Sequence, residues 1–328
     1  MRTWTTILLI FAVTAGTITG AETLKTPAGC VAVDNAKPGP EGYADRVIHQ
    51  KTGIELILIS SGTFVMGTDD RQAASNVAPA HEVTIAQPFY MGKTEVTNGQ
   101  YRRFMQAQPD YDGEADVDPA YDLYLLHFKD KSVMSSEDEY PIVWVGWHNA
   151  MAFCAWAGLQ LPSEAQWEYA CRAGTTTAYS FGDDPSMLDN YAWHDGNSNF
   201  KYHKVGTKEP NPWGLHDMHG NVSEWTLDQY VPDSYATFKD TASNPFEYGK
   251  ELYPRVVRGG SWMDKPEGLR SAVRIASSSD WKEQDPQLPK SIWYHTETQF
   301  LGFRVIRPLV IPSAEDMHKY WTTEGEPD

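Results

Sequence analysis

The sequence predicts a loop-rich α+β fold, and three observations lead to that prediction. Residues 53–66 alternate apolar and polar positions around a Ser-Ser-Gly turn, which is typical of a β-hairpin. Thr97 and Ser163 each precede an amphipathic run and can cap a helix, Ser163 together with Gln166 as a capping box. After Gly174 the apolar periodicity largely disappears, and so much irregular chain would ordinarily argue against a compact domain.

The remaining elements follow from the same patterns along the chain. Short β-branched and aromatic runs predict strands, and apolar residues at helical spacing predict helices. Residues 109–139 are acidic and irregular with an aromatic island, and we interpret them as an insertion. The expected strands are residues 82–85, 88–91, 141–145, 256–257 and 303–306, and the expected helices are residues 97–106, 148–157 and the run after Ser163.

The first 21 residues have the pattern of a signal peptide. Arg2 provides a positive start, residues 7–13 are apolar, and small residues near Ala21 suit cleavage. The apolar run is too short to cross a bilayer, and no later segment is suited to do so. We therefore expect an exported protein, periplasmic or secreted, that is soluble and not embedded in a membrane.

Composition divides the rest of the chain into three parts. Residues 22–45 are punctuated by Pro and Gly and form a predicted N-terminal extension. Residues 46–310 are long enough for two average domains or one large one, and for a sizeable core. Residues 311–328 form a predicted polar, acidic tail.

The charge balance limits the partners. A formal net charge of −17 argues against binding to nucleic acid or to an anionic membrane surface. The chain has 12 Trp and 17 Tyr, which suits an aromatic-lined groove.

Three cysteines are present, Cys30, Cys154 and Cys171. An exported protein can form disulfides, but an odd count leaves at least one thiol free. Cys154 and Cys171 lie in predicted helices, where each is most simply a small buried residue. Their redox state stays open.

A run of oxygen-bearing side chains surrounds Gly220. Asp217, Asn221 and Glu224 follow a segment rich in Gly and Pro, so turning backbone and carboxylates occur together. Calcium collects such ligands, main-chain carbonyls included. The alternative is an ordinary surface turn with solvated acids, because the spacing is not that of an EF-hand.

Several motifs in one order identify a family resemblance. They are Leu-Pro-Ser-Glu-Ala-Gln-Trp-Glu-Tyr-Ala at residues 161–170, Gly-Leu-His-Asp-Met-His-Gly-Asn-Val-Ser-Glu-Trp at 214–225, Arg-Val-Val-Arg-Gly-Gly-Ser-Trp at 255–262, Arg-Ser-Ala-Val-Arg at 270–274 and Gly-Phe-Arg at 302–304. From about Gly53 to about Pro308 the chain resembles the formylglycine-generating enzymes, also called sulfatase-modifying factors. The resemblance implies a loop-rich, C-type-lectin-like α+β fold reinforced by structural calcium. The implied ligands are the side chains of Asp217 and Glu224 and the main-chain carbonyls of Gly220 and Val222.

The chain differs from this family at the positions that hold the catalytic copper in the resembled enzymes. The resembled enzymes hold copper with two cysteines between the Gly-Gly-Ser and Gly-Phe-Arg motifs, and thiolates suit Cu(I). Between Ser261 and Arg304 this chain has no cysteine, so we expect no copper and no formylglycine formation. Ser223 also replaces a tryptophan that walls the peptide groove in the resembled enzymes.

A different set of side chains occupies the segment between those motifs. Residues 279–297 mix aromatic rings with carboxylates, amides and a histidine, which is what a saccharide ring needs. The alternative is that the aromatics anchor a long loop to the core. Arg270 and Arg274 could recognise a carboxylate or sulfate, or could pair with nearby acids. The predicted ligand-binding residues are Ser261, Trp262, Arg270, Arg274, Asp280, Trp281, Trp293 and His295.

Two functions stay open at this point. In the first, the chain is a non-catalytic module that binds a saccharide, a peptide, a sulfated ligand or an exported protein. In the second, it is an oxidoreductase or maturation enzyme of altered chemistry, with catalytic residues that the sequence does not name. The absence of the cysteine pair favours the first function, and the polar groups of residues 280–295 keep the second open.

Overall fold

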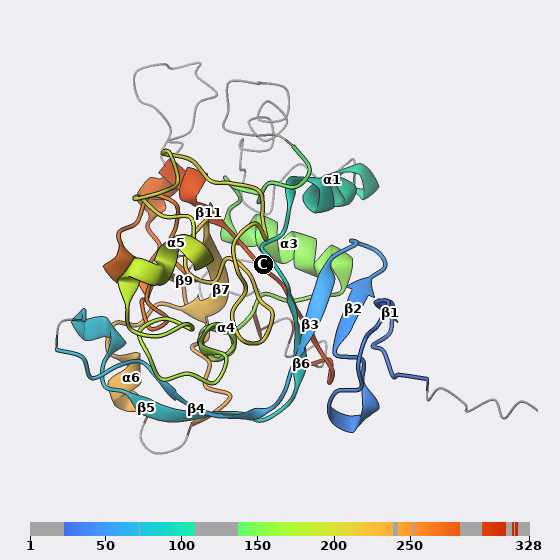
Figure 1. Cartoon of the computed structure of the whole chain (residues 1–328), viewed down its shortest axis with the longest axis horizontal. Helices are drawn as coiled ribbons and strands as arrows, with labels where there is room; N and C mark the ends of the chain where they lie inside the picture. Colours follow the sequence, from blue (N-terminus) through green and yellow to red (C-terminus); the bar gives the residue numbers. More distant parts are fainter. Residues whose placement is uncertain are drawn as a thin grey trace, which may run out of the picture.

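Three small sheets carry the fold of the computed structural model (Figure 1). In Figure 1 the strands of a five-stranded sheet lie at the right, those of a four-stranded sheet lie at the left of centre, and β4 and β5 run along the bottom. The structure describes residues 23–71, 73–108, 137–238, 242–251, 253–282, 297–312, 317, 319 and 320. The predicted signal peptide, most of the predicted insertion and most of the acidic tail lie outside these residues.

The five-stranded sheet joins the two ends of the described chain. Its order is β1 (Cys30–Ala32), β2 (Arg46–His49), β3 (Glu55–Ile59), β6 (Phe89–Gly92) and β12 (Ile306–Pro308), with all neighbours antiparallel. β1 comes from the predicted extension, and Ala44 in the same segment is fully buried. The predicted extension is therefore packed against the domain and contributes an edge strand.

The four-stranded sheet forms the centre of the domain. Its order is β10 (Ile275–Ala276), β9 (Arg255–Arg258), β7 (Ser223–Gln229) and β11 (Leu301–Gly302). Every residue of β7 is buried. The run that contains Gly220 leads directly into β7, so its side chains are placed in the interior.

The predicted hairpin over residues 53–66 is wrong. β3 pairs with β2 and β6, whereas β4 (Gly62–Met66) pairs with β5 (His81–Ile85), which also pairs with β8 (Ala242–Ser243). The chain passes from one sheet to the other at the Ser-Ser-Gly turn. The predicted strand over residues 141–145 is also wrong, because its only ladder contact is a single bridge from Pro141 to Thr97.

The helices begin where their capping residues predict. α1 (Asn98–Ala107) and α4 (Glu164–Arg172) start with complete capping boxes from Thr97 and Ser163. α3 (Trp147–Ala157) ends at Gly158, whose φ of 73° is the left-handed conformation that glycine adopts readily. The short helices are α5 (Leu188–Tyr191), α6 (Ser234–Thr237) and the 3₁₀ turns Pro40–Gly42, Ser75–Val77, Pro185–Met187, Pro266–Leu269, Ser279–Lys282 and Glu297–Phe300.

Two apolar clusters form most of the core. The larger one packs α1 and α3 against the sheets and includes Tyr101, Phe153 and Phe303. The second packs α4 on β4 and β5, with Trp167 at 0% exposure. None of the helices in the described parts of the chain is long and apolar enough to cross a membrane.

Candidate functional site

A buried ion pair occupies the end of the central sheet. Arg304 donates from Nε to Glu224 Oε2 and from Nη2 to Oε1, each at 2.6 Å, and both residues are fully buried. Trp167 Nε1 donates to Glu224 Oε2 at 2.7 Å. Both oxygens of Glu224 are therefore engaged by the protein itself.

Two further carboxyl groups lie beside this pair. Asn221 Nδ2 donates to Glu95 Oε1 at 3.0 Å, and the Gly206 amide donates to Asp217 Oδ2 at 2.6 Å. The other oxygens, Glu95 Oε2 and Asp217 Oδ1, are buried and receive no hydrogen bond. Burial first and the charge of Asp217 second raise the pKa of Glu95 well above its usual range, and burial raises the pKa of Asp217. We refer to Glu95, Asp217, Asn221, Glu224 and Arg304 as the central polar cluster.

The turn into β7 has the unusual backbone that the sequence indicated. Asp217 and Asn221 adopt positive φ angles of 60° and 64°. A Cβ at Gly220 would collide with the Trp193 carbonyl oxygen, so only glycine fits there. The Asp217 and Glu224 side chains are both buried, and the charges of both act on Arg304.

The donor set of the cluster fits a calcium ion in part. Glu95 Oε2 and Asp217 Oδ1 accept no hydrogen bond from a protein N–H or hydroxyl group, and a hard cation would satisfy both oxygens. Glu224 offers no free oxygen, because Arg304 binds both. Across the described residues, no three His, Cys, Asp or Glu side chains are grouped so that they could hold a metal ion. Calcium at Asp217, Gly220, Val222 and Glu224 stays a prediction, and Glu95 is an oxygen donor that sequence reasoning missed.

Trp262 is bonded to the turn at residues 217–222 that precedes β7, which we call the central turn, and Ser261 is its neighbour in the chain. The Trp262 amide donates to the Asn221 carbonyl oxygen at 2.8 Å, and Ser261 Oγ donates to Asp264 Oδ2 at 2.7 Å. Trp262 packs with Val143, Tyr202 and Val222, and the partly buried rings of Tyr140 and Trp144 lie against this group. We call these six residues the Trp262 face.

The two predicted binding arginines are paired with protein carboxylates. Arg274 donates to both oxygens of Glu164, at 2.6 and 2.8 Å, and its side chain is 0% exposed. Arg270 pairs with Asp70 at 3.0 Å. These are the structural ion pairs that the sequence left open as the alternative. Arg274 has no exposed surface with which to recognise a ligand.

The described part of the segment after residue 278 packs on the core. Trp281 lies 6.2 Å from the Trp225 ring and 5.3 Å from the Phe300 ring, measured between centroids, and it borders the larger apolar cluster. Asp280 is exposed. Trp293 and His295 lie outside the described residues, so their predicted role stays a prediction.

None of the cysteines offers a thiolate. Cys30, Cys154 and Cys171 are all buried and free. Burial raises the pKa of each thiol, that of Cys171 to about 12. Each thiol is therefore protonated at neutral pH, and a protonated thiol is a poor ligand for a soft metal.

Comparison with known proteins decides the family. Residues 45–309 match the model of the sulfatase-modifying factor enzyme 1-like domain. The chain belongs to this family of sulfatase-modifying factors. The family assignment and its loop-rich α+β fold, both expected from the motifs, are confirmed.

Relatives of this family member carry different names. It is 28% identical over 311 residues to the formylglycine-generating enzyme of Mycobacterium tuberculosis. That alignment covers 77% of this chain and 97% of the relative. It is 28% identical over 272 residues to the inactive C-alpha-formylglycine-generating enzyme 2 of Bos taurus. That alignment covers 69% of this chain and 84% of the relative. It is 29% identical over 245 residues to serine/threonine-protein kinase pkn1 of Chlamydia caviae. That alignment covers 71% of this chain but only 37% of the relative.

Solved structures agree with the fold. PvdO from Pseudomonas aeruginosa superposes with a TM-score of 0.60 at 22% identity, covering 87% of this chain and 99% of PvdO. Treponema denticola variable protein 1 gives a TM-score of 0.58 at 23% identity, covering 79% and 95%. At this level of identity the likeness extends to the fold alone.

Proposed function

We propose that this sulfatase-modifying factor is an exported binding protein that does not form formylglycine and that holds a saccharide, peptide or sulfated ligand at the Trp262 face. The observation that carries the proposal is the lack of any cysteine between Ser261 and Arg304. The chemistry of the family's formylglycine-generating enzymes needs a pair of thiolates in that segment.

The remaining thiols cannot substitute for the missing pair. Cys154 is on α3 and Cys171 is on α4, in different apolar clusters. Both are buried, and burial raises the pKa of both, so neither presents a thiolate to an incoming copper ion. The bovine relative described as inactive supports the view that the family fold serves without this chemistry.

Ligand binding is supported by the composition of the Trp262 face. Tyr140 and Trp144 are only partly buried, and both pack against the buried group that contains Tyr202 and Trp262, with 6.1 Å between the ring centroids of Tyr140 and Tyr202. Aromatic rings offer stacking surface to a sugar or a peptide side chain, and hydrogen-bonding edges supply specificity. The Trp262 amide, which donates to the Asn221 carbonyl oxygen, holds this face on the turn that precedes β7.

The experiment joins an activity assay to a binding screen. The full chain is incubated with copper, oxygen and a sulfatase-motif peptide, with the Mycobacterium tuberculosis enzyme as positive control, and aldehyde formation is followed by mass spectrometry. We expect no conversion. Conversion that is lost in Cys154→Ser or Cys171→Ser would contradict the proposal, and so would oxygen consumption on any peptide in the screen.

Binding is measured separately on glycan and peptide arrays. We expect a retained ligand whose affinity falls in Tyr140→Ala, with the exposed Phe200→Ala as control. Equal affinity in both variants would remove the Trp262 face from the proposal. Export is tested by mass spectrometry of the protein from its native host, where a chain that still begins at Met1 would contradict it.

A further inference from the structure

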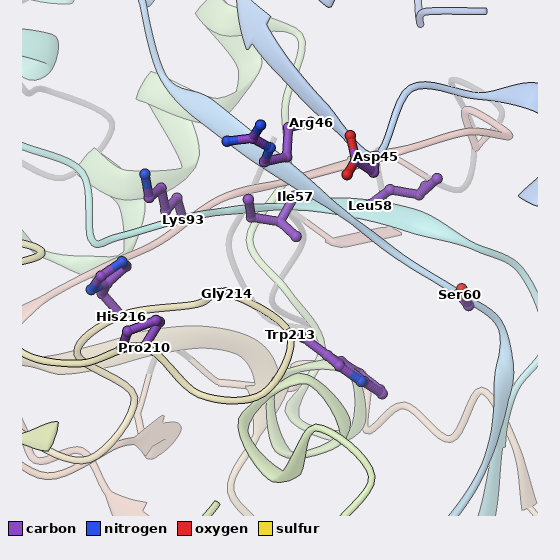
Figure 2. A pocket seen from close by; sticks show the side chains of 10 residues that line it. All are labelled: Asp45, Arg46, Ile57, Leu58, Ser60, Lys93, Pro210, Trp213, Gly214 and His216. Atoms are coloured by element: carbon purple, nitrogen blue, oxygen red, sulfur yellow. The ribbon is translucent and has the colours of Figure 1, made fainter. Parts of the chain in front are cut away.

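A second cavity lies beside the five-stranded sheet. A cavity of about 430 Å³ opens between residues 210–216 and strands β2 and β3 (Figure 2). Its volume is in the range of small-molecule sites. The residues that line it are Asp45, Arg46, Ile57, Leu58, Ser60, Lys93, Pro210, Trp213, Gly214 and His216. None of them belongs to the Trp262 face or to the ligand-binding and calcium-binding residues predicted from the sequence, although Gly214 and His216 lie in the motif at residues 214–225.

Two cations lie at one end of this cavity. Glu55 stands between them, with Lys93 Nζ at 3.0 Å from Oε2 and Arg46 Nη1 at 3.7 Å from Oε1. The longer separation is not a hydrogen bond, so the guanidinium of Arg46 keeps its donors for another partner. Its side chain is 38% exposed. A guanidinium fork of this kind matches the two oxygens of a carboxylate or sulfate.

Groups that suit hydroxyls line other parts of the cavity. His216 Nδ1 lies 2.8 Å from the Lys208 carbonyl oxygen, to which it must donate, so Nε2 of the neutral ring is left as an acceptor. Asp45 Oδ1 accepts the Lys37 amide at 2.7 Å, which fixes this carboxylate in place. Asp45 and His216 can therefore accept hydrogen bonds from hydroxyl groups.

An aromatic wall completes the cavity. The Trp213 ring is held edge-on against Tyr169, with 4.9 Å between the ring centroids. Figure 2 shows Trp213 on the same side as Pro210 and Gly214, across from Arg46 and Asp45. An indole surface beside hydroxyl acceptors is suited to a sugar ring.

We propose that this cavity binds an acidic saccharide, a sugar that carries a carboxylate or sulfate, with its anionic group at Arg46 and Lys93 and its hydroxyls toward Asp45 and His216. The proposal goes beyond the function proposed above, because the residues differ and neither site needs the other. A neutral sugar would leave the Arg46 donors to water. With an anion that has no hydroxyl groups, Asp45 and His216 would stay hydrogen-bonded to water, and the anion would bind less tightly.

The test uses glucuronate as probe and glucose as its neutral counterpart, titrated into the full chain by calorimetry or by ligand-detected NMR. Wild type should bind glucuronate at least about tenfold more tightly than glucose, the size expected for hydrogen bonds to a charged group. Arg46→Gln should remove that advantage, and Arg46→Lys should keep only part of it, because a point charge lacks the fork. The matched control is Arg102→Gln, which removes the same charge from an arginine on α1 that pairs with Asp138.

Glu55→Gln provides a test in the opposite direction. Removing its charge frees both cations, so glucuronate should bind several times more tightly while glucose affinity stays constant. Glucose 6-sulfate shows which anion the fork prefers, and either preference supports the site. Equal affinities for glucuronate and glucose in wild type, or equal losses in Arg46→Gln and Arg102→Gln, would overturn the proposal. Thermal melting of each variant confirms that the chain is folded.

Discussion

Arg304 and Glu224 face each other through two parallel hydrogen bonds of 2.6 Å in the interior of the domain. Arg304 also donates to the carbonyl oxygens of Gly92 and His216, at 3.1 and 3.0 Å. One guanidinium thus joins β7, the end of β6 and the loop before the central turn. The pair connects three segments that a loop-rich fold could not hold together by strand ladders alone.

Arg304→Met should strongly destabilise the domain. Glu224 would be left buried and without its cation, and breaking a buried pair in this way costs about 3–5 kcal/mol. Chemical denaturation measures the loss in the free energy of unfolding. Arg102→Met is the control, because its ion pair is partly exposed and worth about 1 kcal/mol or less. Equal losses in the two variants would show that the Arg304 pair has no special role.

Trp281→Ala should also lower the free energy of unfolding. Trp281 is partly buried and contacts the Trp225 and Phe300 rings, so its loss leaves a gap at the edge of the core. We expect a loss of about 2 kcal/mol, below the 3–5 kcal/mol of a fully buried tryptophan. Phe200→Ala, at a ring that is 84% exposed, should change stability by no more than about 0.5 kcal/mol. Unchanged stability together with weakened ligand binding would instead indicate that Trp281 binds the ligand, as the sequence predicts.

Local signals of the sequence transferred well to the structure. Ser163 and Gln166 bond each other's backbone amides three residues apart, so the residues that decide the start of α4 are all in one short stretch. The hairpin prediction failed for the opposite reason. Whether β3 pairs with β4 or with β6 depends on packing against distant segments, and a Ser-Ser-Gly turn fits a crossover between two sheets as well as a hairpin.

In the candidate site, too, residues that are close in sequence could be grouped from the sequence, whereas distant partners could not. Asp217 and Glu224 are seven positions apart, so the sequence could place both beside one turn, and both side chains are buried near Arg304. Glu95, which completes the cluster, is 126 positions from its partner Asn221 and carries no local sign of its role. For Arg274 the sequence left a ligand and an ion pair both open, and it could not name Glu164, 110 positions away, as the partner that binds Arg274 in the interior.

Stability should fall as the pH decreases below about 6.5, in part because of His219. Its ring donates from Nδ1 to the Leu269 carbonyl oxygen and accepts at Nε2 from the Ser180 amide, so the buried ring is neutral. Burial lowers its pKa to about 4, whereas an unfolded histidine has a pKa of about 6.5. The folded state then binds fewer protons than the unfolded state, and the stability present above pH 6.5 is lost on the way to pH 4.

By pH 5 this loss amounts to about 2 kcal/mol for His219. Denaturation series at pH 7 and pH 5 measure it, and His219→Gln should reduce the difference. His49, whose pKa is also lowered to about 4, contributes with the same sign, so the variant keeps part of the slope. An unchanged slope in His219→Gln, or an imidazole that titrates near pH 6.5 by NMR, would contradict the assignment.

Calcium should raise the melting temperature through Asp217 and Glu95. Their oxygens Oδ1 and Oε2 are buried without a hydrogen-bond donor, and a cation bound only by the folded state would compensate both. At a hundredfold excess of calcium over its Kd the gain is about 2.7 kcal/mol. For a domain of this size that corresponds to roughly 5–10 °C between calcium and chelator.

Variants distinguish the carboxylates that bind calcium from those that only stabilise the fold. Asp217→Asn and Glu95→Gln should shrink the melting difference between calcium and chelator, because each removes half or more of the charge available to the ion. Glu139→Gln, an acid that is 68% exposed and pairs with Lys204, should leave the difference unchanged. Glu224→Gln tests the remaining predicted ligand: an equal fall of the melting temperature in both buffers would mean that Glu224 only binds Arg304, and a smaller difference between the buffers would mean that it also binds calcium. A protein that carries no calcium by elemental analysis and melts identically in both buffers would show that the two free oxygens share a proton instead of a cation.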